Sequence, residues 1–218
     1  MSRTKWVPCM CSNVEVEMLR DEMQKLRDKQ TFVSSWDPET MLPPFTDVIM
    51  EATDGRSVHS HVSTLMGKSE VFKELLSKMK ATNCGPFELK MDMDHDSLEA
   101  FIHFFYSGSV RDEMMEFVAD KLLRAANKYK IPLLHQRCQE KLVNSIHPEK
   151  IFQLYLLGIK CDAQELVQAV ISYSATAFAD VSEIHGYEEF LKDDPALVAR
   201  LCNGVVKRLK KLKDAHIN

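Results

Sequence analysis

The sequence predicts an α+β fold, in which a small sheet of short strands packs against a cluster of helices, followed by an all-α region. Two observations carry this prediction. Residues 96–142 show helical periodicity interrupted by short links, and apolar helices of this kind need a partner layer to bury their faces. Residues 45–91 supply short alternating segments that suit half-buried strands. Strand patterns then stop, apart from a possible short strand near Val110.

The helical half begins with an amphipathic helix over residues 96–106. Asp96 places a polar side chain at its start, and Gly108 lies just past its end, where a left-handed residue usually closes a helix. A second helical pattern covers residues 122–129. Pro132 is placed to open a third helix, which carries apolar side chains one turn apart: Leu134, Cys138 and Leu142.

A β-hairpin is predicted at the start of the folded module. Pro43-Pro44 interrupts any preceding element, so the module begins there. Residues 47–52 read as a strand, Thr53-Asp54-Gly55 as a tight turn and residues 56–59 as the returning strand. A further strand is expected at residues 87–91.

Two short helices are expected between the hairpin and that last strand. The first covers residues 61–66, and the second follows Ser69, whose side chain is suited to cap it. The second helix places four apolar side chains on one face: Phe72, Leu75, Leu76 and Met79.

Composition and charge limit the possible classes of protein. The 218 residues are 45% hydrophobic, and 28 Lys and Arg face 32 Asp and Glu, for a net charge of −4. This balance gives no global indication of nucleic acid or an anionic membrane as a partner. No apolar run approaches the roughly 20 residues of a membrane helix, and the six cysteines are scattered. We therefore expect a soluble intracellular protein with thiols in a reducing compartment.

Residues 1–44 read as an N-terminal extension that contains one amphipathic helix. Its apolar stripe has two interpretations: it packs on its own domain, or it forms a short coiled coil with a second chain. Cys9 and Cys11 suggest loosely packed thiols rather than a zinc site, because no further His or Cys follows before His59. The stripe consists of Val16, Leu19, Met23, Leu26 and Val33.

The order and spacing of these segments resemble the BTB/POZ domain family, over residues 45–145. Members of this family have a small sheet packed with a helical cluster, as expected above. The resemblance rests on three groups of residues. They are Phe45-Thr46-Asp47-Val48 with His61, Leu65, Ser69, Val71 and Phe72; Phe101, Phe105, Tyr106, Gly108 and Val110; and Leu122, Leu123, Ala125, Ala126, Tyr129, Leu134, Cys138 and Leu142.

Residues 146–218 resemble the BACK-like helical region of proteins similar to speckle-type POZ protein, and plant BTB/POZ proteins also fit. The resembling segments are 148–158, 164–171, 186–191 and 195–201. Independently of the family, the apolar residues of this region are spaced for helices that bury one side.

An enzyme or a metal site is not expected. The acidic residues Asp92, Asp94 and Asp96 crowd around His95, but Asp94 or Asp96 is explained as a helix N-cap. His61 matches a position that the family uses structurally. The sequence has no phosphate-binding glycine loop, nucleophile elbow or His-Glu-x-x-His pair. No cofactor is expected.

The resemblance implies a protein-interaction function. BTB domains form homodimers or heterodimers, and many hold a cullin scaffold as substrate adaptors of cullin-RING ubiquitin ligases. Carried over to this chain, the cullin contact falls on Met79 and Leu76. The implied dimer interface combines the N-terminal helix with the first helix of the domain: Leu19, Met23, Leu26, Val62 and Leu65.

Two departures from the family pattern leave an alternative open. Ala81 stands where cullin-binding members carry a glutamate, and Val62 replaces the basic residue that would pair with Asp47. The alternative is a homo- or hetero-oligomerisation protein that binds no cullin and serves a transcription or scaffold role. In either case the substrate or partner protein stays open.

A basic run near the C-terminus has two readings. It suits a nuclear-localisation patch, but positive charge at a helix C-terminus also complements the helix dipole. Localisation is accordingly expected in the cytoplasm, the nucleus or both. The run contains Lys207, Arg208, Lys210, Lys211 and Lys213.

Overall fold

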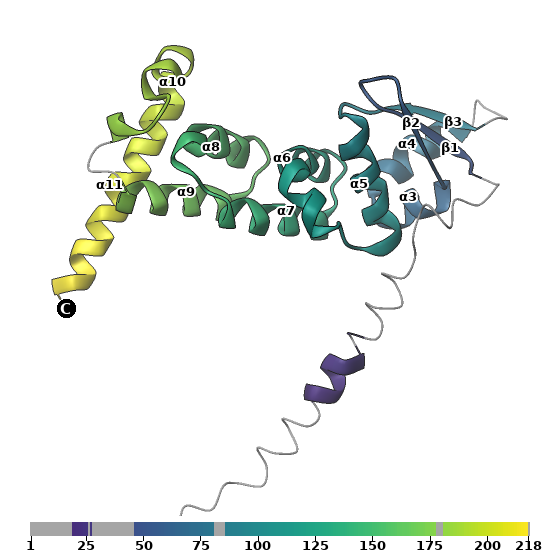
Figure 1. The fold of residues 1–218 in the computed structure, drawn as a ribbon, viewed down its shortest axis with the longest axis horizontal. Helices are drawn as coiled ribbons and strands as arrows, with labels where there is room; N and C mark the ends of the chain where they lie inside the picture. The colour runs from purple at the N-terminus through teal and green to yellow at the C-terminus, as the bar shows by residue number, and fades with distance from the viewer. Residues whose placement is uncertain (1–18, 26, 28–45, 81–85, 178–180, 218) are drawn as a thin grey trace, which may run out of the picture.

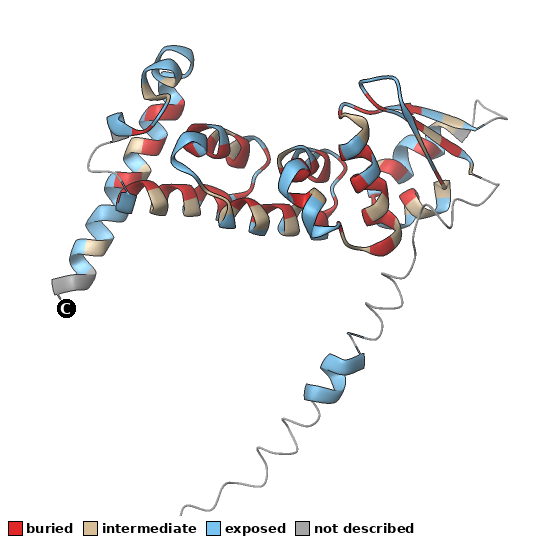
Figure 2. Cartoon of the chain, in the orientation of Figure 1, coloured by how far each residue is buried: buried red, intermediate tan, exposed pale blue. Residues whose placement is uncertain are grey.

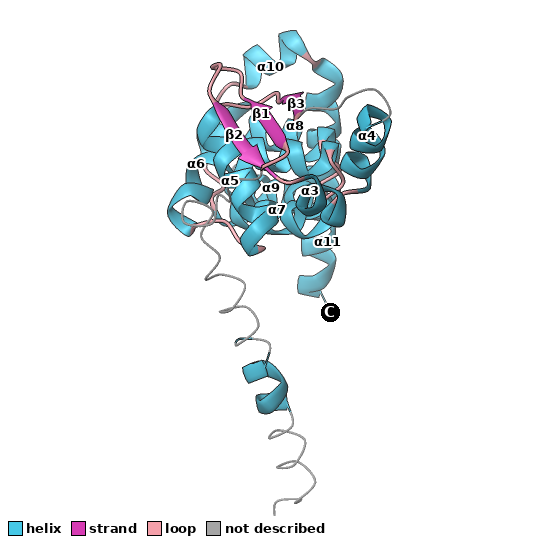
Figure 3. Cartoon of the chain, turned by 90° about the vertical axis from the view of Figure 1, so that its right-hand side faces the viewer, coloured by secondary structure: helices cyan, strands magenta, loops and turns pink. Residues whose placement is uncertain are grey.

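A computed structural model describes residues 19–25, 27, 46–80, 86–177 and 181–217. The described chain is a three-stranded sheet with helices packed against it, extended by further helices that lead away from the sheet (Figure 1). Viewed from the sheet end, the strands lie at the front of this arrangement (Figure 3). The predicted fold class is confirmed.

The sheet has the strand order β2-β1-β3. Strand β1 (Val48–Glu51) pairs antiparallel with β2 (Ser57–Ser60) and parallel with β3 (Phe87–Lys90). The turn between β1 and β2 contains Gly55 at φ 81°, a backbone conformation that favours glycine. All three predicted strands are present, with ends at most one residue from the expected ones.

Two helices follow the hairpin: α3 (Val62–Lys68) and α4 (Glu70–Lys80). The predicted cap is confirmed, because the Ser69 hydroxyl accepts a hydrogen bond from the Phe72 amide at 3.2 Å. The same hydroxyl donates to the Tyr129 carbonyl oxygen at 2.6 Å, which ties α4 to the last turn of α6. The Phe72 ring stacks on the Tyr129 ring at 4.4 Å, inside the aromatic core of the domain.

The three central helices are α5 (His95–Ser107), α6 (Asp112–Lys128) and α7 (Pro132–Asn144). The predicted closure by Gly108 at φ 72° and the predicted opening by Pro132 are confirmed. Two predictions were wrong in extent. Helix α6 begins ten residues before Leu122, and Val110 lies in an irregular link instead of a strand, with its side chain in the core.

The region after α7 is helical in its described part, as predicted. It contains η1 (Pro148–Lys150), α8 (Ile151–Lys160), α9 (Gln164–Ala177), η2 (Val181–Glu183), α10 (Tyr187–Asp193) and α11 (Pro195–Ile217). Buried residues line the faces that these helices turn toward each other, whereas residues 206–214 of α11 are largely exposed (Figure 2). None of the described helices is long and apolar enough to cross a membrane.

The hairpins α6–α7 and α8–α9 are joined by the same type of turn. Lys130 in the first turn and Asp162 in the second have φ values of 50° and 53°. In each, the residue after this position donates its amide to a carbonyl five residues earlier, at 2.8 Å. The first turn of α7 contacts the second of these turns, because His135 Nε2 donates to the Cys161 carbonyl oxygen at 2.8 Å. The second hairpin therefore stacks on the first.

Candidate protein-interaction site

The residues predicted to contact a cullin lie at the C-terminal end of α4. Met79 is half-buried, and Leu75 on the same helix is 39% exposed. Leu76 is 1% exposed and belongs to the core of the domain. A side chain with almost no accessible surface cannot touch a partner unless α4 moves, so Leu76 is corrected to a core residue. The contact at Met79 stays a prediction. Ala81 lies outside the described residues.

The residues predicted for the dimer interface fall into two groups. In the domain, Val62 is half-buried at the first position of α3, whereas Leu65 is fully buried in the core and is corrected to a packing residue. In the N-terminal extension, Leu19 and Met23 are helical and 56% and 53% exposed. Their exposure contradicts packing on the chain's own domain for these two side chains. The Leu26 side chain lies outside the described residues.

Asp47, which would pair with a basic residue in the family pattern, binds the start of α3 instead. The Asp47 carboxylate accepts a hydrogen bond from the Val62 backbone amide at 2.7 Å. That amide is one of the unpaired donors at the start of α3. Beside it, His61 Nδ1 lies 2.6 Å from the Tyr106 hydroxyl, so the histidine ties α3 to α5. Both residues have structural partners, as expected for His61.

Asp94, in the acidic loop before α5, is the N-cap of that helix. Asp94 accepts from the Ser97 amide at 3.1 Å and pairs with Lys121 at 2.7 Å. Burial raises the pKa of Asp94, but the hydrogen bonds from Lys121 and Ser97 outweigh it and lower the pKa to about 2. Within the described residues, no three His, Cys, Asp or Glu side chains are placed to hold a metal ion.

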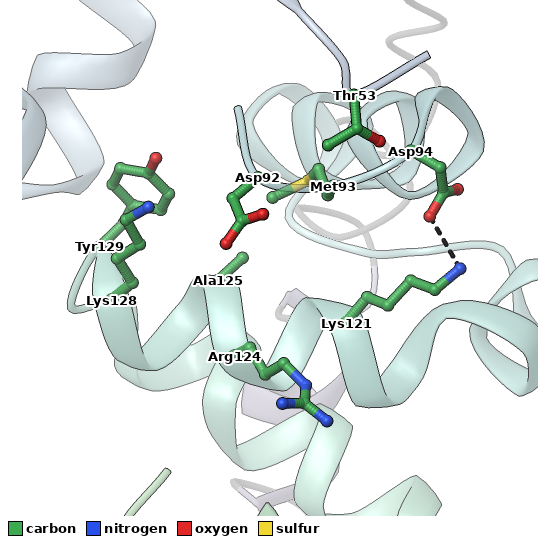
Figure 4. A pocket seen from close by; sticks show the side chains of 9 residues that line it. All are labelled: Thr53, Asp92, Met93, Asp94, Lys121, Arg124, Ala125, Lys128 and Tyr129. Atoms are coloured by element: carbon green, nitrogen blue, oxygen red, sulfur yellow. Dashed lines mark ion pairs between the residues drawn. The ribbon is translucent and has the colours of Figure 1, made fainter. Parts of the chain in front are cut away.

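A pocket of about 310 Å³ adjoins this loop (Figure 4). Lys121 points to Asp94 across one side of it, and Arg124 extends away from this ion pair. The ion pair and the Asp94 cap already occupy the polar groups on that side, so the pocket offers little for a ligand.

A larger groove of about 480 Å³ separates α6 from α8. Its floor contains the nearly buried side chains of Leu142, Leu154 and Leu157. At its edge, Phe117 on α6 is 79% exposed, the highest value among the large apolar side chains of the described chain. Aromatic side chains at interfaces often carry much of the binding free energy.

The basic residues near the end of α11 are all exposed: Lys207, Arg208, Lys210, Lys211 and Lys213. They lie on the part of α11 farthest from the sheet (Figure 1).

Comparison with known proteins identifies the part of the chain that contains the sheet and helices α3 to α7. Residues 39–146 match the family model of the BTB/POZ domain. The chain contains a BTB/POZ domain. Domains of this family are protein–protein interaction and oligomerisation modules, so α4, α3 and the groove beside α6 belong to, or border on, an interaction module.

Curated relatives are similar to this chain over most of its length. A BTB/POZ domain-containing protein of Arabidopsis thaliana is 26% identical over 196 residues, which cover 85% of this chain and 79% of the relative. Protein maternal effect lethal 26 of Caenorhabditis elegans is 25% identical, covering 85% of this chain and 45% of the relative. The chain thus spans less than half of the second relative. The BTB domain of zebrafish PATZ1 aligns at 23% identity and a TM-score of 0.36, covering 66% of this chain and all of that domain.

Sequence reasoning missed the groove at the border of the BTB domain. The stretch Asp112–Asp120 received no helix prediction, so Phe117 was not assigned to a face. A usable signal was present: Phe117 follows Glu116, while the apolar residues Met115 and Val118 occupy the core-facing positions of the same helix. A large aromatic residue outside the apolar stripe indicates an exposed contact.

Proposed function

We propose that this chain is a substrate adaptor of a cullin-RING ubiquitin ligase, which binds a cullin and pairs with a second chain through its BTB domain. The observation that carries the proposal is the position of Met79. Its side chain keeps exposed surface at the last turn of α4, the place where the resemblance to cullin-binding members puts the contact. The flexible thioether of methionine adapts well to an apolar pocket of a partner.

Titration of the purified chain with cullin N-terminal domains tests this proposal. Met79→Asp places a charge in the contact and is expected to weaken binding by two orders of magnitude or more, because an unpaired charge is buried there. Leu133→Asp is the matched control, since Leu133 is 50% exposed on α7. Unchanged cullin affinity of a folded, dimeric Met79→Asp protein contradicts the assignment.

The second candidate function is oligomerisation without cullin. The Asp47 carboxylate accepts a hydrogen bond from the Val62 amide instead of pairing with a basic residue. Ala81 replaces the expected glutamate. Two features of the cullin-binding pattern are therefore altered. Ala81→Glu separates the two functions. It is expected to strengthen an existing cullin interaction, and absence of binding in both the parent and the Ala81→Glu protein favours the oligomeriser.

Pairing through the BTB region is common to both candidates. The exposed apolar side chains Leu19 and Met23 and the half-buried Val62 support a two-fold interface that includes the N-terminal helix. Light scattering at about 20 µM should report a dimer, because a standard-size interface holds at such concentrations. A monomer at this concentration contradicts the proposed pairing through the BTB region.

The regional assignments rest on the same resemblance. We place an extension at residues 1–44, the BTB domain at residues 45–145 and a BACK-like region, similar to that of speckle-type POZ protein, at residues 146–218. Cytoplasmic and nuclear residence are both compatible with the proposed function. Deletion of residues 207–213 in a fluorescent fusion tests the nuclear part, since loss of nuclear signal is expected if the basic run directs import.

A further inference from the structure

The last part of α11 projects past the helices on which α11 packs (Figure 1, Figure 3). Packing reaches Val205, which is 5% exposed, and the preceding Gly204 lies close to Ile171 of α9. From residue 206 to residue 214 the helix is exposed except at Leu212, which is half-buried. These nine residues, called here the α11 end, form a surface that the described part of the chain leaves largely open.

Two large apolar side chains are exposed on the α11 end. Val206 is 48% exposed and Leu209 is 37% exposed. They are three residues apart, so they lie on the same side of the helix. Single exposed apolar side chains are ordinary, whereas neighbouring ones surrounded by polar groups mark a binding surface.

Positive charge surrounds these two side chains. The α11 end contains five cations and one anion, Asp214, for a local net charge of +4 in a chain of net charge −4, so the rest of the chain carries −8. The overall balance therefore conceals a local basic surface. Within the described residues, no ion pair involves any of these cations. They are Lys207, Arg208, Lys210, Lys211 and Lys213.

The spacing of these residues places a cation beside each exposed apolar side chain. Lys210 follows Val206 by four residues, and Lys213 follows Leu209 by four, and positions four apart are neighbours on one face of a helix. The aliphatic stem of a lysine can cover apolar surface while its charged head reaches a more polar layer. Helices that lie in a membrane interface have this arrangement, with apolar groups below the headgroups and cations among them.

The distribution of charge over the whole chain also favours a lipid surface. An anionic bilayer attracts the α11 end and repels the remaining chain, which carries −8. Nucleic acid is bound through phosphates and polar base contacts, and a nuclear-localisation patch needs only the cations. Neither of these uses the exposed side chains of Val206 and Leu209.

We propose that the α11 end binds an anionic lipid surface. Val206 and Leu209 insert at the boundary between headgroups and acyl chains, and the five cations contact the headgroup phosphates. The helix lies in the plane of the interface, and the BTB domain faces away from it. This binding goes beyond the proposed function, because it uses neither Met79 nor the surface proposed for pairing.

Sedimentation of the full chain with sucrose-loaded vesicles tests the proposal. Vesicles of phosphatidylcholine with about 30 mol% phosphatidylserine are expected to bind the chain at about 0.1 M salt, and vesicles of phosphatidylcholine alone at least tenfold more weakly. About 0.5 M salt should weaken binding to the anionic vesicles at least tenfold, because salt screens the charges. Absence of binding to anionic vesicles at about 1 mM lipid overturns the proposal.

An apolar variant separates a lipid surface from other anionic partners. Val206→Ser combined with Leu209→Ser keeps all five cations and is expected to lower the partition coefficient into anionic vesicles at least tenfold. Leu133→Ser is the control, since Leu133 is 50% exposed on α7, and should change it less than twofold. Unchanged partition of the serine double variant, with circular dichroism showing it folded, would mean that charge alone binds, as it does for nucleic acid, and overturns the proposal.

A charge variant tests the position of the basic surface. Lys210→Glu combined with Lys211→Glu keeps both apolar side chains and is expected to lower the partition coefficient at least tenfold. Lys78→Glu combined with Lys90→Glu is the control, because it changes the net charge equally on exposed positions of α4 and β3. This control should change partition less than twofold. Equal losses in the two double variants would assign binding to overall charge and overturn the proposal.

Discussion

At the scale of single residues, Asp94 has the clearest consequence for stability. It caps α5 and pairs with Lys121, and its pKa of about 2 lies below the roughly 3.9 of an unfolded aspartate. A depressed pKa means that the contribution to stability is complete above about pH 5 and is lost as the pH falls toward 2.

We expect Asp94→Ala to lower the free energy of unfolding at pH 7 by about 1–2 kcal/mol, the usual cost of removing an N-cap. Urea titrations between pH 2 and pH 7 should show a flatter pH dependence than that of the parent. Asp92→Ala is the control, because Asp92 is exposed on the same loop. An equal loss of unfolding free energy in both variants would show that the charge of the loop, and not the cap, stabilises the protein.

The buried cysteines lead to a second prediction at this scale. Burial, together with the nearby charge of Asp120, raises the pKa of the Cys138 thiol to about 12, and burial also raises that of Cys161. Because the thiolate is the reactive form, both should resist iodoacetamide at pH 8 in the native protein and react in about 8 M urea. Mass spectrometry of the proteolytic peptides measures the alkylation of each cysteine. Rapid alkylation of Cys138 in the native protein would contradict its burial.

Local chemistry explains which residues were predictable. Ser69, Gly108 and Pro132 were assigned correctly because capping, left-handed closure and helix opening depend on the residue and its immediate neighbours. The partnership of Asp47 with the Val62 amide was not predictable, since the two residues lie on different elements that meet through tertiary packing. The same applies to Leu65 and Leu76, whose apolar character suited an interface as well as a core.

At the scale of elements, two glycines set how closely helices approach. A Cβ on Gly158 in α8 would lie 2.8 Å from Val167 Cγ2 and 3.4 Å from the Val167 amide nitrogen. A Cβ on Gly204 in α11 would lie 2.8 Å from Ile171 Cδ1, the end of a longer and more mobile side chain. Valine has a stiff χ1 and cannot move away in the same manner.

We therefore expect different outcomes for the same substitution. Gly158→Ala should lower the free energy of unfolding by about 1–2 kcal/mol, because overpacking exceeds the helix-propensity gain of about 1 kcal/mol. Gly204→Ala should stay within about 0.5 kcal/mol of the parent, since Ile171 can turn aside. Thermal and urea unfolding measure both, and similar losses would mean that the α9–α11 contact is as rigid as the α8–α9 contact.

The extent of α6 shows a limit of sequence reading at this scale. Its first ten residues bury Met115, Val118 and Ala119, but four acidic residues among them dilute the apolar pattern. Their charge suits the first turns of a helix, so the helix forms where periodicity alone is weak. The groove at Phe117 was not predicted either, because a groove forms there only when α6 and α8 lie beside each other.

At the scale of the whole molecule, the helical layers follow one another along the chain. Hairpin α8–α9 stacks on α6–α7, and α11 packs on α9. In such an arrangement each layer depends mainly on its neighbours, as in repeat proteins, and the layer at the end can open while the rest stays folded.

Leu201→Ala tests this expectation. Leu201 is fully buried on α11, and its truncation should cost about 2–5 kcal/mol locally. Hydrogen exchange is expected to accelerate in α10 and α11 while α5 keeps its protection. The control is Leu98→Ala in α5, where the side chain is also fully buried and where loss of protection should spread through the BTB domain. Uniform acceleration by Leu201→Ala would indicate a single cooperative unit.

The parallel pairing of β3 with β1 also affects how the chain folds during its synthesis. The hairpin β1–β2 and the helical hairpins join neighbours in sequence and can form as soon as each leaves the ribosome. Strand β3 emerges only after α3 and α4, and until then one edge of β1 has unpaired backbone groups that can recruit another nascent chain. The interval between completion of β2 and arrival of β3 is therefore the period in which this protein is most exposed to aggregation.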